Sequence, residues 1–126
     1  MKMLNSEVLT RSQVKAIYKA TIERIREQGT LPLSPCSDVN EKNLLCAGAL
    51  LVRSGLALCC SEEKARDFET ALLNTRNKSL ILEGAAQIGL STAEVQAKIA
   101  LNDSLTVSGR AEGVISYINE RLKKFN

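Results

Sequence analysis

Hydrophobic side chains recur at helical spacing in the first part of the chain. They are Val14, Ile17, Tyr18, Ile22 and Ile25. Side chains three and four residues apart lie on one face of an α-helix, so this pattern predicts an amphipathic helix. Thr10 and Gln13 fit a capping box before the pattern, and Gly29 suits the left-handed position that ends many helices. We therefore predict a helix to about Gln28, followed by a loop over residues 29 to 38.

The next stretch is apolar on nearly every side. The segment from Leu44 to Cys60 carries a single charged residue, Arg53. It is slightly short for a membrane span, and a charge at its middle would be unfavourable in lipid. Asp38 and Glu41 fit a second capping box before it. We therefore predict a buried central helix over about residues 39 to 60.

Small residues recur seven positions apart in this central helix. Ala47 pairs with Ser54, and Gly48 pairs with Gly55. Because small side chains leave a shallow groove along a helix, we expect another helix to approach closely there. The sequence leaves open whether that helix belongs to the same chain or to a partner.

Four further helices are predicted after the central one. Ser61 can cap the third helix, and the polar residues from Asn74 to Ser79 interrupt it. The inner face of this helix is expected to carry Ala65, Phe68 and Leu72. The remaining helices are expected over about residues 79 to 88, 92 to 101 and 109 to 124. Ser91 and Glu94 fit a capping box at the start of the helix over residues 92 to 101. The fold class is therefore all-α, a compact bundle of about five to six helices around the buried apolar helix at about 39–60. We expect residues 1–126 to form a single helical domain, with residues 1–9 as a candidate flexible N-terminus.

The composition supports this fold class and adds little about partners. Hydrophobic residues make up 44% of the chain but aromatic residues only 3%, so the core must be built from Leu, Ile, Val and Ala, which favours helices. The net charge of +3 is mild, and opposite charges are interspersed along the chain instead of forming a basic tract. No apolar run follows the basic start at Lys2, so no signal peptide is indicated. We expect a cytoplasmic protein that does not bind a membrane.

The usual catalytic and metal-binding residues are missing from the sequence. The chain has no histidine, which excludes Ser-His and Cys-His nucleophile pairs. Its four cysteines, which form no CxxC pair, are Cys36, Cys46, Cys59 and Cys60. Glu63 and Asp67 lie one helical turn apart, but their charged neighbours are typical of an ordinary solvated surface. We therefore predict no enzyme activity, no cofactor and no metal site.

Two arginines lie at positions where the guanidinium charge needs a partner. Arg53, inside the apolar helix, must reach solvent, meet a carboxylate or bind an anionic ligand. We favour a buried ion pair with a partner such as Glu83 or Glu69, and we keep a ligand site as the alternative. Arg110 lies between two glycines near a predicted helix start, where we prefer a cap and turn to an anion site.

Residues 79–101 predict two helices joined at a tight corner. A helix-turn-helix needs a small residue between its helices, a glycine in the turn and apolar anchors, and Ala85, Gly89, Leu90 and Val95 meet these needs. As a DNA reader, the second helix would offer a set of polar contacts. They are Ser91, Thr92, Gln96 and Lys98. Glu94 is unfavourable near phosphates, and the third anchor falls at Ile99 instead of at Lys98. We therefore favour a structural corner.

These patterns predict a small, non-enzymatic helical protein that acts through protein–protein interaction. A homodimer is one form of that contact, because the central helix is unusually apolar and carries small residues. The first alternative is a DNA-binding regulator that uses residues 79–101. The second alternative is a helical bundle that binds a small apolar or anionic ligand.

Overall fold

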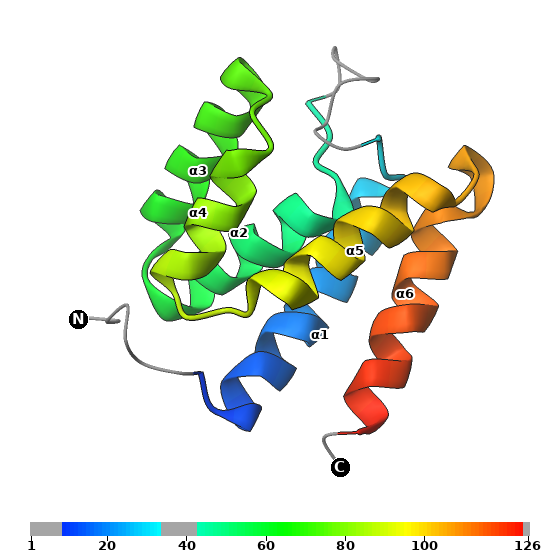
Figure 1. Ribbon diagram of the computed structural model, residues 1–126, viewed down its shortest axis with the longest axis horizontal. Helices are drawn as coiled ribbons and strands as arrows, with labels where there is room; N and C mark the ends of the chain where they lie inside the picture. Colours follow the sequence, from blue (N-terminus) through cyan, green and yellow to red (C-terminus); the bar gives the residue numbers. More distant parts are fainter. Residues whose placement is uncertain (1–8, 34–42, 125–126) are drawn as a thin grey trace.

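A computed structural model describes residues 9–33 and 43–124 of the chain. The helices of these residues are α1 (Arg11–Gln28), α2 (Ala47–Cys59), α3 (Glu62–Thr75), α4 (Ser79–Gln87), α5 (Thr92–Ser104) and α6 (Val107–Lys123). No strand occurs among the described residues. Helix α2 lies at the centre and packs against α1, α3, α4 and α5, whereas α6 packs against α1 and α5 (Figure 1). The all-α bundle around a central helix that the sequence predicts is confirmed.

Helix α1 begins and ends where the sequence pattern places it. The backbone N–H of Gln13 donates to the Thr10 hydroxyl at 3.1 Å, and the backbone N–H of Thr10 donates to the Gln13 side chain at 2.8 Å. These two bonds form the capping box and satisfy donors that the first helical turn leaves free. Gly29 closes the helix with a φ of +88°. Leu9, which we assigned to a flexible N-terminus, is buried, and residues 1–8 lie outside the described residues.

Helix α2 begins later than predicted. Residues 43–46 are not helical, and the helix starts at Ala47, not near residue 39. The capping box proposed at Asp38 and Glu41 lies outside the described residues. The backbone N–H of Ala47 donates instead to the side-chain oxygen of Asn102 at 3.0 Å, and the amide nitrogen of Asn102 donates to the Pro32 carbonyl at 2.8 Å. A side chain from α5 therefore satisfies the N-terminus of α2, which a search for local caps misses.

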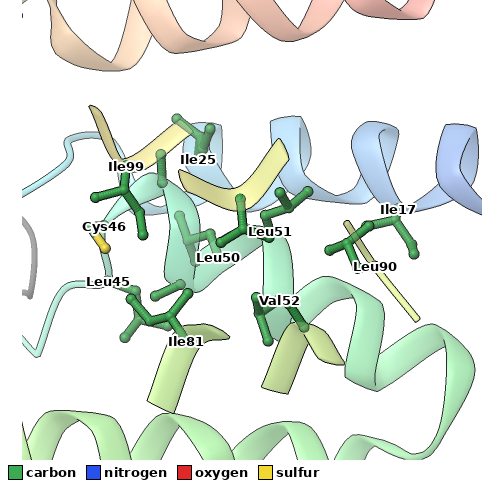
Figure 2. Close-up of a cluster of buried hydrophobic side chains, with 14 of the residues drawn as sticks. Ile17, Ile25, Leu45, Cys46, Leu50, Leu51, Val52, Ile81, Leu90 and Ile99 are labelled. Atoms are coloured by element: carbon green, nitrogen blue, oxygen red, sulfur yellow. The ribbon is translucent and has the colours of Figure 1, made fainter. Parts of the chain in front are cut away.

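The small residues of α2 admit neighbours from the same chain. A Cβ added to Gly48 would lie 2.4 Å from Ile99 of α5, and one added to Gly55 would lie 2.4 Å from Ile88. Every residue from Ala47 to Leu56 is buried. Figure 2 shows Leu50, Leu51 and Val52 of this helix among the apolar side chains of its neighbours. The close approach predicted from the spacing of small residues is therefore an intramolecular packing contact.

The later helices follow their predicted positions with shifted ends. The hydroxyl groups of Ser61 and Ser91 accept from Lys64 N and Glu94 N, as expected for the caps of α3 and α5. Helix α5 continues to Ser104 instead of ending near residue 101, and α6 begins at Val107, capped by Thr106, instead of near residue 109. No helix within residues 9–33 and 43–124 is long and apolar enough to span a bilayer.

Arg110 ties the α5–α6 connection to the loop after α1. Its side chain is buried and donates to the Leu105 carbonyl at 2.9 Å and 3.2 Å, and to the Leu31 carbonyl at 3.0 Å. The guanidinium therefore satisfies backbone acceptors of the protein itself. This geometry matches the cap and turn that we preferred to an anion site.

Candidate functional site

The α4–α5 connection is the tight corner that the sequence predicts. Gly89 adopts a φ of +78°, which only glycine takes at little cost. The backbone N–H of Leu90 donates to the Ala85 carbonyl at 2.9 Å, and Val95 is completely buried. Ala85, Gly89, Leu90 and Val95 therefore form the helical corner that the sequence predicts.

The residues proposed to contact nucleic acid separate into two groups. Ser91, Thr92 and Gln96 are exposed, but Lys98 has an exposed fraction of 0%. The prediction that Lys98 lies on the reading surface is therefore wrong. Lys98 takes the third anchor position of the helix, because its charge finds partners inside the protein. The exposed side of α5 is left without a cation for a phosphate to meet.

Lys98 belongs to a polar cluster that joins α1, α5 and α6. Its Nζ donates to Glu94 Oε1 at 2.8 Å and to the Tyr18 hydroxyl at 3.2 Å. The Tyr18 hydroxyl donates to the same Glu94 oxygen at 2.8 Å, and Arg121 of α6 donates to the other. The Lys98 ammonium also lies 4.6 Å from the centre of the Tyr18 ring and 5.1 Å from that of Tyr117, within range of cation–π attraction. We call Tyr18, Glu94, Lys98 and Arg121 the Lys98 cluster.

Burial shifts the protonation equilibria of this cluster. Desolvation lowers the pKa of Lys98, although the neighbouring Glu94 carboxylate opposes that shift. Burial alone would raise the pKa of Glu94, but the donors Lys98 and Tyr18 hold it below its usual value. Burial and the bond to Glu94 raise the pKa of Tyr18. The Glu94 carboxylate therefore accepts hydrogen bonds from donors on three helices, α1, α5 and α6.

Arg53 is held by two carboxylates of α3. Its Nη2 lies 2.7 Å from Glu62 Oε2, and its Nε lies 2.8 Å from Glu69 Oε1. Of the two partners suggested by the sequence, Glu69 pairs with Arg53, whereas Glu83 forms no ion pair with Arg53 and lines a different pocket. The hydrogen bond with Glu62 raises the pKa of Arg53 and lowers that of Glu62. The guanidinium thus forms ion pairs with two carboxylates, and it also lines a pocket of about 250 Å³ together with residues of α1 and α3.

A groove runs along the outer side of α3 and α4. Its volume is about 280 Å³. Its floor is formed by the apolar or small residues Leu56, Phe68, Ala71, Leu80 and Gly84, and its rim by the polar residues Lys64, Asp67, Glu83 and Gln87. We call these nine residues the α3–α4 groove. Figure 1 shows α3 and α4 side by side at one edge of the molecule, with α6 at the opposite edge.

The two helices contribute matching stripes to this groove. The α3 residues are Lys64, Asp67, Phe68 and Ala71, and the α4 residues are Leu80, Glu83, Gly84 and Gln87. Each set follows the spacing i, i+3, i+4, i+7, which places its members on one face of a helix. Gly84 permits the close packing of α4, because a Cβ there would lie 2.7 Å from Val52 and 3.3 Å from Phe68.

The groove was not predicted from the sequence, because it depends on two helices lying side by side. We assigned Asp67 to an ordinary solvated face and Phe68 to the inner face of its helix, although Phe68 is only half-buried. The signal was the stripe on α3, where two charged residues share a face with Phe68 and Ala71. That stripe is informative only when α4 is known to lie beside it.

The described cysteines form no metal site. Cys46 is buried, Cys59 is half-buried and Cys60 is exposed. Burial raises the pKa of Cys59, which disfavours the thiolate that binds metals. No group of three or more metal-binding side chains occurs within the described ranges, outside which Cys36 lies.

Comparison with known proteins returns no relative for this chain. No family model, no curated protein and no solved structure matches it.

Proposed function

We propose that this protein acts by binding another protein through the α3–α4 groove. The observation that carries the proposal is an apolar floor, centred on half-buried Phe68 and Leu80, that is open to solvent between two exposed helices. Interfaces gain most of their affinity where aromatic and aliphatic side chains become fully desolvated. A partner side chain that fills the groove would desolvate Phe68 and Leu80 together.

The two charged clusters are weaker candidates for a working surface. The donors of Arg53 and Lys98 already meet carboxylates or a hydroxyl of the chain. A bound ligand would have to displace those partners, and an unpaired buried charge is strongly unfavourable. The groove needs no such rearrangement, which supports protein binding over a ligand held within the bundle.

The DNA-binding alternative has lost its main support. Of its four candidate contacts, Lys98 was the only cation, and it is buried. Phosphate contacts from lysine and arginine supply most of the affinity of sequence-independent DNA binding. Without them, the corner formed by α4 and α5 is better explained as part of the core.

The partner we propose is a different protein. The homodimer hypothesis rested on the apolar, small-residue face of α2, and Ile88 and Ile99 of the same chain occupy that face. Light scattering at micromolar concentration should therefore give the mass of one chain. A two-chain mass that Ala71→Trp reduces to one chain would instead assign the groove to a second copy.

Photocrosslinking provides the test of the proposed function. A photoreactive phenylalanine would replace Ala71, which lines the groove, or Ala86, an exposed α4 alanine outside it. We expect one protein to crosslink from position 71 in the source cells and not from position 86. Binding of that purified protein should weaken about tenfold or more with Ala71→Trp and remain unchanged with Ala86→Trp. Equal crosslinking from both positions, or binding that Ala71→Trp leaves intact, would contradict the proposal.

A further inference from the structure

The partner's chemistry can be inferred from the walls of the α3–α4 groove. We infer that the docked segment is an amphipathic helix whose apolar stripe is flanked on both sides by basic residues. This inference rests on the proposed function and adds the class of partner to it. It follows from the length of the groove, the small residues that open it and the charges along its rim.

The shape of the groove fits a helix. Helices α3 and α4 are joined by a short turn at residues 76–78 and run in opposite directions (Figure 1). Each contributes a stripe of seven-residue span, about 10 Å at a rise of 1.5 Å per residue, which equals two helical turns. Ala71 and Gly84 carry little or no side chain on the floor, so a third helix can lie between α3 and α4 and complete a three-helix arrangement.

The floor of the groove requires an apolar stripe on that helix. Leu56 closes the bottom, and Phe68 and Leu80 stand half-buried on either side. Side chains of the Leu, Ile or Met class at two successive turns would fill the space above Gly84 and remove these surfaces from water. A polar side chain there would lose its hydrogen bonds to water without finding a partner on the floor.

The rim carries carboxylates on both walls that no cation of the described chain holds. Asp67 on α3 and Glu83 on α4 are exposed, and neither takes part in an ion pair among the described residues. Two other carboxylates of α3, Glu62 and Glu69, are bound to Arg53. With Lys64, the rim has a charge of +1 − 2 = −1, opposite in sign to the chain's +3. Basic residues on each side of the partner's apolar stripe would meet Asp67 and Glu83.

The rim also favours one orientation of the partner helix. Lys64 and Gln87 lie at the end of the groove away from the α3–α4 turn, where neither wall carries a carboxylate. A cation at that end would meet Lys64 and be repelled. Charge placement of this kind contributes more to specificity and to the rate of association than to affinity. The basic residues should therefore lie toward the middle of the docked segment, with a polar or acidic residue beyond them.

The experiment selects binders from a displayed library of two-to-four-turn helical peptides with varied apolar and flanking positions. The selection target is the wild-type chain, and binders are screened against Ala71→Trp. We expect groove-dependent binders with an apolar stripe and an excess of Lys and Arg beside it. The double substitution Asp67→Asn with Glu83→Gln should weaken the binding of these peptides about tenfold. Raising the salt concentration from about 50 to 500 mM should weaken their binding by a similar factor. The matched control, Glu63→Gln with Glu112→Gln, removes the same charge from exposed positions outside the groove and should leave binding unchanged.

The outcomes separate the two proposals. If the selected binders depend on the groove but show no basic excess, or bind the Asp67 and Glu83 variant as tightly as the wild type, the inference fails and the groove remains a docking site. If no selected peptide is sensitive to Ala71→Trp, the groove is not a helix-binding site and the inference fails, whereas the proposed function is decided by crosslinking from position 71.

Discussion

The two edges of this molecule use charge in opposite ways. In the Lys98 cluster, between α1, α5 and α6, a completely buried ammonium is satisfied by Glu94 and Tyr18 of the same chain. At the α3–α4 edge, Asp67 and Glu83 stand exposed beside an open apolar floor. Charges that meet partners within the chain hold helices together, whereas charges left beside an apolar groove are available to another molecule. Substitutions at the two edges should therefore have separable effects on stability and on binding.

The largest effect on stability is expected from Glu94→Gln. The substitution keeps the shape of the side chain but removes the carboxylate that pairs with both Lys98 and Arg121. Breaking a buried ion pair leaves an uncompensated charge, and we expect a loss of about 3 kcal/mol in the free energy of unfolding, the low end of the usual range. The 29% exposure of the Glu94 side chain is the reason for choosing the low end. Urea unfolding followed by circular dichroism measures it, with Glu120→Gln on α6 as the control. A loss no larger than that of the control would show that the cluster does not hold α6 in place.

Acid should remove part of the stability that Glu94 contributes. The pKa of Glu94 is lower in the folded chain than in the unfolded chain, so the unfolded state takes up protons first as the pH falls. The contribution is fully present above the unfolded value of about 4.3 and is lost as the pH falls through the lower folded pKa. The gap in unfolding free energy between wild type and Glu94→Gln should therefore narrow between about pH 5 and pH 3. A gap that stays constant over this range would contradict the assignment.

A smaller effect is expected from Lys98→Met. Methionine keeps most of the apolar stem but removes the buried charge. Glu94 still accepts hydrogen bonds from Tyr18 and Arg121. Because both the charge and its desolvation penalty disappear together, we expect a loss of about 1 kcal/mol or less in unfolding free energy. The same urea titration measures it. A loss as large as that of Glu94→Gln would identify Lys98, not the carboxylate, as the centre of the cluster.

The smallest effect on stability is expected at the opposite edge. Asp67→Asn with Glu83→Gln changes two exposed side chains without ion pairs among the described residues, so stability should change by no more than about 0.5 kcal/mol. Thermal and urea unfolding provide the measurement. A loss of stability comparable to that of Glu94→Gln would mean that the rim carboxylates serve the fold, and the contrast between the two edges would disappear.

Much of the fold was predictable because helix signals are local. The Thr10–Gln13 capping box, the Gly29 stop and the serine caps at Ser61 and Ser91 each depend on groups within a few residues. Ser91 also shows the limit of such reasoning. The sequence suggests a reciprocal capping box with Glu94, but the Glu94 side chain bonds to Tyr18, Lys98 and Arg121 instead. A carboxylate can accept hydrogen bonds from any donor that lies near it in space, and these three donors lie on three different helices.

The predictions of the start of α2 and of an exposed Lys98 were wrong for the same physical reason. A continuous apolar run does not indicate where a helix begins, and the cap of α2 comes from Asn102, 55 residues away from Ala47. By polarity, Lys98 belongs at the surface, yet its partner Tyr18 lies 80 residues away in the chain. Neither contact has a counterpart in the local sequence pattern.

The sequence by itself determined that this chain is helical, where most of its helices stop, and that α2 lies at the centre. These properties depend on backbone capping within one turn and on the burial of a long apolar run. Both depend on residues that are neighbours in the sequence. Only the tertiary structure decided which charges are used internally and which remain available. That decision depends on side chains from separate helices meeting in space, as Arg53 meets Glu62 and Glu69 while Asp67 and Glu83 are left beside the α3–α4 groove.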